Sequence, residues 1–154
     1  MKTVFTVSIY IDTKTNMLII PSAKNEHGIR MGVNYPQKLV WEGGNYSELG
    51  EKFIEAYQVS STHPPIKRAD AVKVFAVATG VKSWVQFAKQ RQMICVSMVK
   101  EDSIFEIEFW KRQADNSFGN DVGDVFPKRE LPADATAEEI GRAIIDVYKE
   151  AGVL

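Results

Sequence analysis

The first segment with a clear pattern runs from Phe5 to Ile11, where apolar and polar residues alternate. A period of two predicts a β-strand that is buried on one face and wet on the other. Residues 12–16 are turn formers, and the apolar run Met17–Ile20 predicts a second strand that Pro21 stops. The chain is therefore expected to begin as a β-hairpin.

Two shorter strands, Ile29–Val33 and Lys38–Trp41, are expected next, before a glycine pair that breaks the sheet. Asn45 can then cap a helix that has Glu48 at its third position. Apolar residues recur at helical spacing after this cap, at Leu49, Phe53, Ala56 and Tyr57. A loop from His63 to Asp70 follows the helix.

The middle of the chain predicts one short helix and two longer strands. The run Met93–Val99 is apolar at nearly every position, which indicates a strand that is buried on both faces. Ile104–Lys111 alternates instead and indicates a sheet with one wet face, and one or two further strands are expected between Val122 and Leu131. The short helix precedes these strands and has its apolar residues at Val81, Trp84, Val85 and Ala88.

The last predicted helix has the clearest signature. Thr136 and Glu139 form a capping box, an apolar stripe follows, and Gly152 closes the helix. The order of elements is about four strands, a middle helix, a short helix, about four strands and a C-terminal amphipathic helix. This order predicts an α+β fold with mostly antiparallel pairing, in a single domain spanning residues 1–154.

The composition is that of an ordinary globular protein, with 45% hydrophobic and 25% charged residues. The single cysteine, Cys95, cannot form an intramolecular disulfide, which suits a reducing compartment. The N-terminal residues lack the continuous apolar segment of a signal peptide, and no stretch approaches the ~18 apolar residues that span a bilayer. We therefore expect a cytoplasmic protein that does not bind membranes.

The net charge of −1 conceals an asymmetry along the chain. Residues 1–100 carry a net charge of +6, whereas residues 101–154 carry −7. Charges scattered over a solvated exterior explain this pattern most simply. The alternative is an acidic surface that meets a basic partner.

Residues that could carry catalysis or bind a metal are few. A thiol inside an apolar strand, as Cys95 is expected to be, has a raised pKa and little reactivity. His27 has Glu26 as a carboxylate neighbour but is better explained as part of a hairpin loop, and His63 stands before two prolines in a loop. Neither histidine has a companion ligand at zinc-binding spacing. The sequence therefore predicts no catalytic residue, no metal site and no cofactor.

Three weaker patterns also favour a structural explanation. The glycine pair before the first helix could receive a phosphate, but Glu48 and Glu51 in the first turns would repel it. Residues 115–121 resemble a calcium loop but lack its glycine at position six and its terminal glutamate. Glu106 and Glu108 on one strand face could serve acid-base or two-metal chemistry, although a solvated strand face is the simpler reading.

A nucleic-acid-binding surface remains the main alternative to a protein-binding one. Single strands are held by basic grooves with aromatic stacking platforms. Trp84 and Phe87 could be such platforms, although aromatic residues at helical spacing are more often part of a core. The basic residues around them are Lys67, Arg68, Lys73, Lys82, Lys89 and Arg91.

Several short motifs, taken in their order along the chain, resemble the immunity proteins of bacterial contact-dependent growth inhibition systems. None of these motifs is catalytic, and the resemblance covers most of the chain. They are Val7–Tyr10 with the hairpin to Pro21, Lys24–Gly32, Ser47–Glu51, Thr79–Trp84, and Glu130–Pro132 before Ala137–Gly141.

This resemblance implies a cytosolic inhibitor that neutralises the C-terminal toxin domain, commonly a nuclease, delivered by a neighbouring cell. Some members look similar to the Whirly single-stranded-DNA-binding fold, which implies two antiparallel sheets of about four strands each. An acidic surface would then meet basic toxin residues, and strand addition at a sheet edge is a second available mode. The candidate toxin-binding residues are Glu106, Glu108, Asp121 and Asp124, with Glu48, Glu51 and Glu55 on the first helix as another surface.

Overall fold

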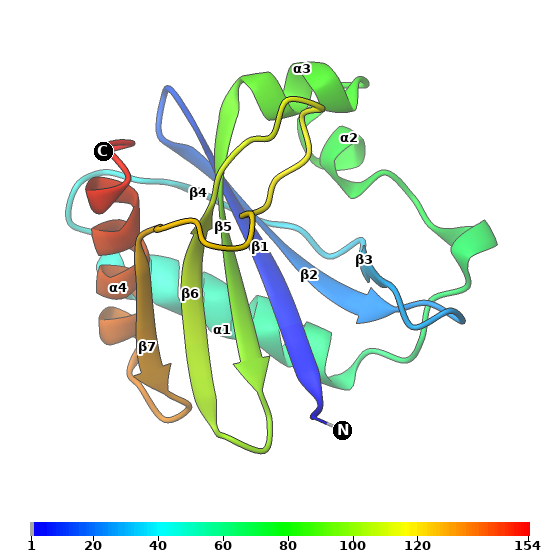
Figure 1. The fold of residues 1–154 in the computed structure, drawn as a ribbon, viewed down its shortest axis with the longest axis horizontal. Coiled ribbons are helices and arrows are strands. Elements are labelled where there is room, and N and C mark those ends of the chain that lie inside the picture. Colours follow the sequence, from blue (N-terminus) through cyan, green and yellow to red (C-terminus); the bar gives the residue numbers. More distant parts are fainter. Residues whose placement is uncertain (1) are drawn as a thin grey trace.

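One antiparallel sheet of seven strands organises the computed structural model, which describes residues 2–154 (Figure 1). The strand order is β3-β2-β1-β5-β6-β7, and β4 pairs with the same outer edge of β2 as β3 does. The strands are β1 (Val4–Asp12), β2 (Asn16–Lys24), β3 (Arg30–Gly32), β4 (Gln37–Val40), β5 (Arg91–Val99), β6 (Ile104–Trp110) and β7 (Lys128–Pro132). The helices are α1 (Tyr46–Thr62), the 3-10 turn η1 (Arg68–Asp70), α2 (Val74–Thr79), α3 (Trp84–Lys89) and α4 (Ala137–Glu150).

The expectation of two separate sheets of about four strands is wrong. β1 pairs with β2 on one edge and with β5 on its other edge, where all nine residues from Val4 to Asp12 are in register. Because both edges of β1 are hydrogen-bonded, the N-terminal hairpin and the C-terminal strands belong to the same sheet. The α+β class and the antiparallel pairing are confirmed.

The expectation that Pro21 ends the second strand is also wrong, since β2 continues to Lys24. The carbonyl of Pro21 accepts a hydrogen bond from the Val33 amide, so the proline nitrogen faces the same outer edge. On that edge β4 pairs only as far as Ile19 and β3 begins at Ser22. The missing N–H therefore falls in the gap between two partners and costs no ladder hydrogen bond.

The back face of the sheet is covered by α1 and α4, which lie side by side behind the strands (Figure 1). The odd-numbered residues of β1, such as Ile9, meet Phe53 of α1 and Ile144 of α4 in the larger of two cores. Tyr148 is completely buried, and its hydroxyl donates a hydrogen bond to the Ile9 carbonyl at 2.8 Å. The predicted capping box of Thr136 and Glu139 is confirmed at the start of α4.

The front face is covered over only part of its area. Val74 of α2, Phe87 of α3 and the strand residues Tyr10 of β1 and Met93 of β5 form a second core there. β5 therefore contributes to both cores, as its uniformly apolar sequence predicts. The helix α2 is not predicted by the sequence, because its residues VFAVAT include no polar side that would reveal a helical period. Of the strands expected between Val122 and Leu131, only β7 forms.

Two glycines allow α1 and α4 to cross in direct contact near their N-terminal ends. A Cβ atom at Gly50 would overlap the carbonyl group of Ala137, and a Cβ at Gly141 would overlap that of Tyr46. The contact is reciprocal, because each glycine faces the backbone of the other helix. Both helices can therefore pack on the same face of the sheet.

We expect Gly50→Ala to lower the free energy of unfolding by about 1–3 kcal/mol, because the new methyl group must push α4 away. The loss should exceed the gain in helix propensity, which is about 1 kcal/mol. Urea unfolding followed by circular dichroism measures the change. Gly44→Ala is the matched control, since a Cβ there has nothing within 4 Å. Equal stability of the two variants would contradict the crossing described above.

Candidate functional site

The part of the front face beside the second core carries mostly polar side chains, with the buried residues Ile20 and Cys95 at its boundary with that core. The register places one row of neighbours across five strands, and a second row runs parallel to it. Across β2, β1, β5, β6 and β7, in that order, the first row is Ser22, Thr6, Ser97, Glu106 and Glu130, with Ser22 and Thr6 joined by their hydroxyls. The second row is Ile20, Ser8, Cys95, Glu108 and Lys128. These two rows, with the cavity beside them, are called the open face below.

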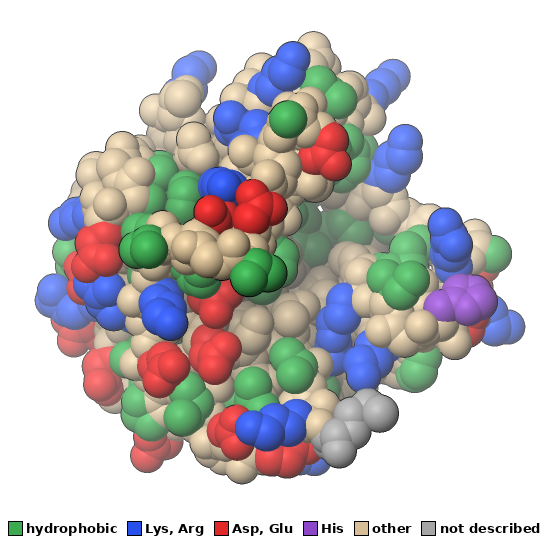
Figure 2. Space-filling view, viewed as in Figure 1, with side chains coloured by type: hydrophobic (Ala, Val, Ile, Leu, Met, Phe, Trp, Pro, Cys, Tyr) green, Lys and Arg blue, Asp and Glu red, His purple; other side chains and the backbone are tan. Residues whose placement is uncertain are grey.

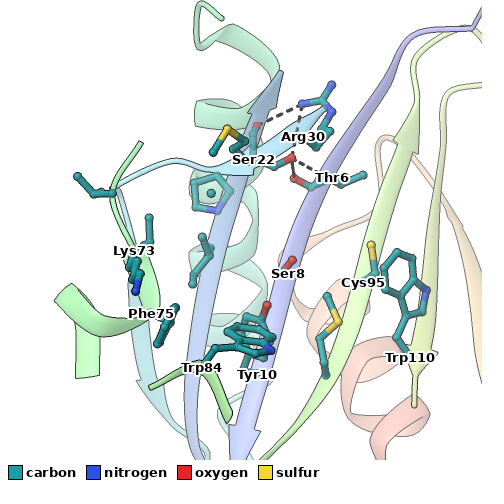
Figure 3. A pocket seen from close by; sticks show the side chains of 17 residues that line it. Thr6, Ser8, Tyr10, Ser22, Arg30, Lys73, Phe75, Trp84, Cys95 and Trp110 are labelled. Carbon is teal, nitrogen blue, oxygen red and sulfur yellow. Dashed lines mark hydrogen bonds between the residues drawn. The ribbon is translucent and has the colours of Figure 1, made fainter. Parts of the chain in front are cut away.

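A cavity of about 570 Å³ lies where the open face meets α2, α3 and β3 (Figure 3). Strands β1, β2 and β5 form its floor, with Thr6, Ser8 and Cys95 directed toward it. Lys73 and Phe75, at the start of α2, form one wall. The remaining walls include Arg30, Trp84 and Trp110. Its volume lies within the range of about 300–1,000 Å³ that is usual for binding sites.

Arg30 closes one end of the cavity through hydrogen bonds to main-chain carbonyls. Its guanidinium group donates to the carbonyl of Ser22 at 3.2 Å and to that of Val4. The hydroxyls of Ser22 and Thr6 lie 2.6 Å apart beside it. Partial burial lowers the pKa of Arg30 from its ordinary value. Arg30 therefore fastens β3 to the sheet, and Lys73 is the exposed cation on this side of the cavity.

The other side of the open face is acidic. Glu106 and Glu130 stand directly opposite each other on β6 and β7, and neither forms an ion pair within residues 2–154. Like charges at directly opposed positions of a sheet are destabilising. Glu108 faces Lys128 and accepts a hydrogen bond from the Trp110 indole at 3.2 Å. Figure 2 shows acidic side chains on one side of the hollow and basic ones on the other.

Asp121 and Asp124, which the sequence suggests as toxin contacts, are engaged within the protein. The Nζ atom of Lys111 lies 3.3 Å from a carboxylate oxygen of Asp121 and 2.9 Å from one of Asp124. The lysine lowers the pKa of the Asp124 carboxyl, and both carboxylates raise the pKa of Lys111. The two aspartates therefore hold the loop between β6 and β7 in shape.

The three glutamates of α1 are exposed, but α1 lies on the back face of the sheet. Glu48 accepts a hydrogen bond from the Asn45 side chain at 2.9 Å, and Glu55 accepts one from the Tyr35 hydroxyl at 2.8 Å. Asn45 occupies the N-cap position without the side-chain cap bond that its residue type favours. The candidate acidic residues thus divide between two sides of the molecule. Glu48, Glu51 and Glu55 are not part of the open face.

The aromatic residues suggested as stacking platforms are packed inside the front core. Phe87 has no exposed surface, and Trp84 is half-buried and donates from its indole to the Asn116 carbonyl at 2.9 Å. The guanidinium of Arg91 lies 4.3 Å from the Phe87 ring and donates to the Phe87 carbonyl. Phe87 is therefore a core residue, whereas Trp84 packs against the core and also lines the cavity.

Cys95 lies on the cavity floor with 4% of its surface exposed, and burial raises the pKa of its thiol to about 12. His27 is exposed and lies 3.6 Å from Glu26, and His63 is exposed with its Nδ1 atom 2.7 Å from the Pro64 carbonyl. Across residues 2–154, no three His, Cys, Asp or Glu side chains gather closely enough to hold a metal ion. In the same part of the chain, no helix is long and apolar enough to cross a membrane.

Sequence reasoning missed several residues of the open face. The hydroxyl groups of Thr6 and Ser8 could have been found from the polar phase of the first strand. Ser97 and Glu130 carry no such signal, because only the strand register brings them into the same row. Arg30 and Lys73 belong to segments that fold back over the sheet, so the sequence alone does not place them beside the cavity.

Two solved structures are similar to this chain along nearly its whole length. A protein of unknown function from Neisseria meningitidis matches with a TM-score of 0.70 and 12% identity, over 96% of this chain and 95% of that one. A chain of the CdiA-CT/CdiI toxin and immunity complex from Yersinia pseudotuberculosis matches with a TM-score of 0.64 and 12% identity, over 96% and 97%. No protein-family model and no curated protein sequence matches. At this level of identity the likeness shows a shared fold.

The raised pKa of Cys95 predicts a loss of stability in alkaline solution. Above the ordinary thiol pKa of 9.0 the unfolded chain releases a proton that the folded protein retains until about pH 12. Folding stability therefore falls as pH rises through this window, by up to about 1.4 kcal/mol per pH unit. Between about pH 8 and about pH 10.5, wild type should lose more stability in urea unfolding than Cys95→Ala, which lacks the thiol. Equal losses would contradict a buried, protonated Cys95.

Proposed function

We propose that this protein is an immunity protein. It binds the C-terminal toxin domain of a contact-dependent growth inhibition effector through the open face of its sheet and thereby neutralises it. The observation that carries this proposal is a half-covered sheet with unneutralised glutamates, in a fold similar along its whole length to a chain of a toxin and immunity complex. The inhibitor acts as a binding protein and needs no catalytic group of its own.

The charge on the open face favours a basic partner. Glu106 and Glu130 repel each other in the free protein, because each stands opposite a like charge. Lysine or arginine side chains placed over them would remove this repulsion and gain charge-assisted hydrogen bonds. A nuclease must itself attract phosphates, so its substrate cleft is basic. A nuclease toxin is therefore the partner that best complements β6 and β7.

The arrangement of charges also explains how one toxin could be selected. Complementary potentials accelerate association and exclude partners with the wrong charge pattern. The acidic strands lie on one side of the open face, and Lys73 and Arg30 lie on the other, so a partner must match both signs in the correct orientation. The hydroxyl groups of Thr6, Ser8 and Ser97 between them supply directional hydrogen bonds. The open face therefore offers specificity as well as attraction.

The direct test mixes the purified protein with the C-terminal domain of the effector encoded beside its gene. We expect a one-to-one complex in size-exclusion chromatography and loss of the toxin's nuclease activity at equimolar inhibitor. A toxin domain that elutes separately and stays fully active would overturn the proposed function.

Glu106→Gln should change toxin binding and folding stability in opposite directions. Removing the charge should stabilise the free protein by about 0.2–1 kcal/mol, because it relieves the repulsion with Glu130. The same change should slow association with the toxin and reduce its dependence on salt. Stopped-flow mixing and urea unfolding measure the two effects.

Glu51→Gln is the matched control, because Glu51 is exposed on α1 behind the sheet. It should leave the association rate unchanged. Slower association in Glu51→Gln, with no effect in Glu106→Gln, would move the toxin-binding surface from the open face to α1.

A further inference from the structure

The loop between β6 and β7 presents two valines to solvent. Val122 and Val125 have relative exposures of 107% and 102%, the highest among the exposed large hydrophobic residues of the chain. Most proteins scatter single apolar residues over the surface, but here two of them share one turn of five residues. Residues 121–125 are called the valine tip below.

The valine tip is held in a defined conformation. The Asp121 amide donates to the carboxylate of Asp124 at 2.7 Å, and the Asp124 amide donates to the Asp121 carbonyl at 3.1 Å. Gly123 between them has φ of +89°, a conformation that other residues rarely adopt. Lys111 forms ion pairs with both aspartates, which add to these two hydrogen bonds in fixing the turn. The two aspartates of the tip therefore hold Val122 and Val125 in a fixed orientation.

The rest of the loop anchors this turn to the sheet. Phe118 packs against the front core beside Tyr10, with their ring centroids 5.9 Å apart. The side chain of Asn120 donates to the carbonyl of Phe109 on β6 at 2.8 Å. Figure 1 shows the loop crossing in front of β5 and β6, on the same side of the sheet as the open face. The valine tip therefore borders the acidic strands.

We propose that the valine tip inserts into an apolar depression on the toxin domain that covers the open face. This inference rests on the proposed function and names a second contact made by the same partner. The occupant is the toxin because the tip is continuous with the open face, so a protein seated on β6 and β7 also reaches the turn. Apolar contact at the edge of a charged surface adds affinity that charge alone does not supply.

The rigid turn favours this role. A contact that is already ordered in the free protein loses little conformational freedom on binding, so more of the apolar contact energy appears as affinity. Lys111 acts as a positioning residue, since it fixes the tip without being part of its apolar surface. Asp121 and Asp124 are positioning residues for the same reason, which replaces the direct toxin contact expected from their charge.

The test substitutes both valines by threonine, an almost isosteric residue that keeps the shape and the net charge. The double variant Val122→Thr and Val125→Thr should bind the toxin about tenfold more weakly or worse, mainly through faster dissociation. Its urea midpoint should match that of wild type, because neither valine contacts the core. Val77→Thr is the control, since Val77 is 63% exposed on α2. It should bind as wild type does.

The outcomes distinguish this inference from the proposed function. If the wild-type protein fails to bind the toxin, the proposed function itself is wrong. If wild type binds and the double variant binds equally tightly, only the valine tip is wrong. Light scattering of the protein alone tests whether the tip instead binds a second copy of the chain. If wild type is a dimer and the double variant is a monomer, the tip is a dimer contact and the proposal is overturned.

Discussion

The contact of α1 with α4 at two glycines is the constraint on which the rest of the structure depends. Gly50 and Gly141 let the two helix backbones meet, so both helices fit on one face of the sheet. The hydroxyl of Tyr148 then reaches the central strand β1 and joins the helix layer to it. The larger core is complete on this face alone. The front face can therefore remain partly uncovered without loss of the fold.

The consequences for function follow from this division of the sheet. Where α2, α3 and Phe118 cover the front face, the strand residues are apolar, whereas the open face beside them carries the hydroxyls of serine and threonine residues and the carboxylates of β6 and β7. The open face does not maximise the stability of the free protein, because Glu106 of β6 stands directly opposite Glu130 of the neighbouring strand β7. Natural proteins retain such unfavourable pairs where binding requires them. The repulsion is consistent with a surface that a basic partner completes.

Local patterns predicted the individual elements but not how they assemble. The alternation in the first strand identified which residues face a core, and the capping box of Thr136 located the start of α4. The single sheet could not be predicted, since β1 and β5 are about eighty residues apart and their pairing depends on register rather than on composition. Pro21 misled for a related reason, because a proline is tolerated wherever its nitrogen faces a gap between partner strands.

The same distinction holds for the candidate site. Glu106 and Glu108 were predictable members of a wet strand face, whereas their neighbours Glu130 and Ser97 come from pairings between strands. Asp121 and Asp124 looked like free acidic contacts, but Lys111 lies ten and thirteen positions earlier and the fold brings it between them. Charge along a chain identifies candidates, and only the folded chain shows which charges remain unpaired.

Hydrogen exchange of the protein, alone and with its toxin domain, tests the central claim most directly. Amides of β6, β7 and residues 121–125 should exchange more slowly in the complex, while the exposed side of α1 should be unaffected. Protection confined to α1, with β6 and β7 unchanged, would contradict the assignment of the open face as the toxin-binding surface.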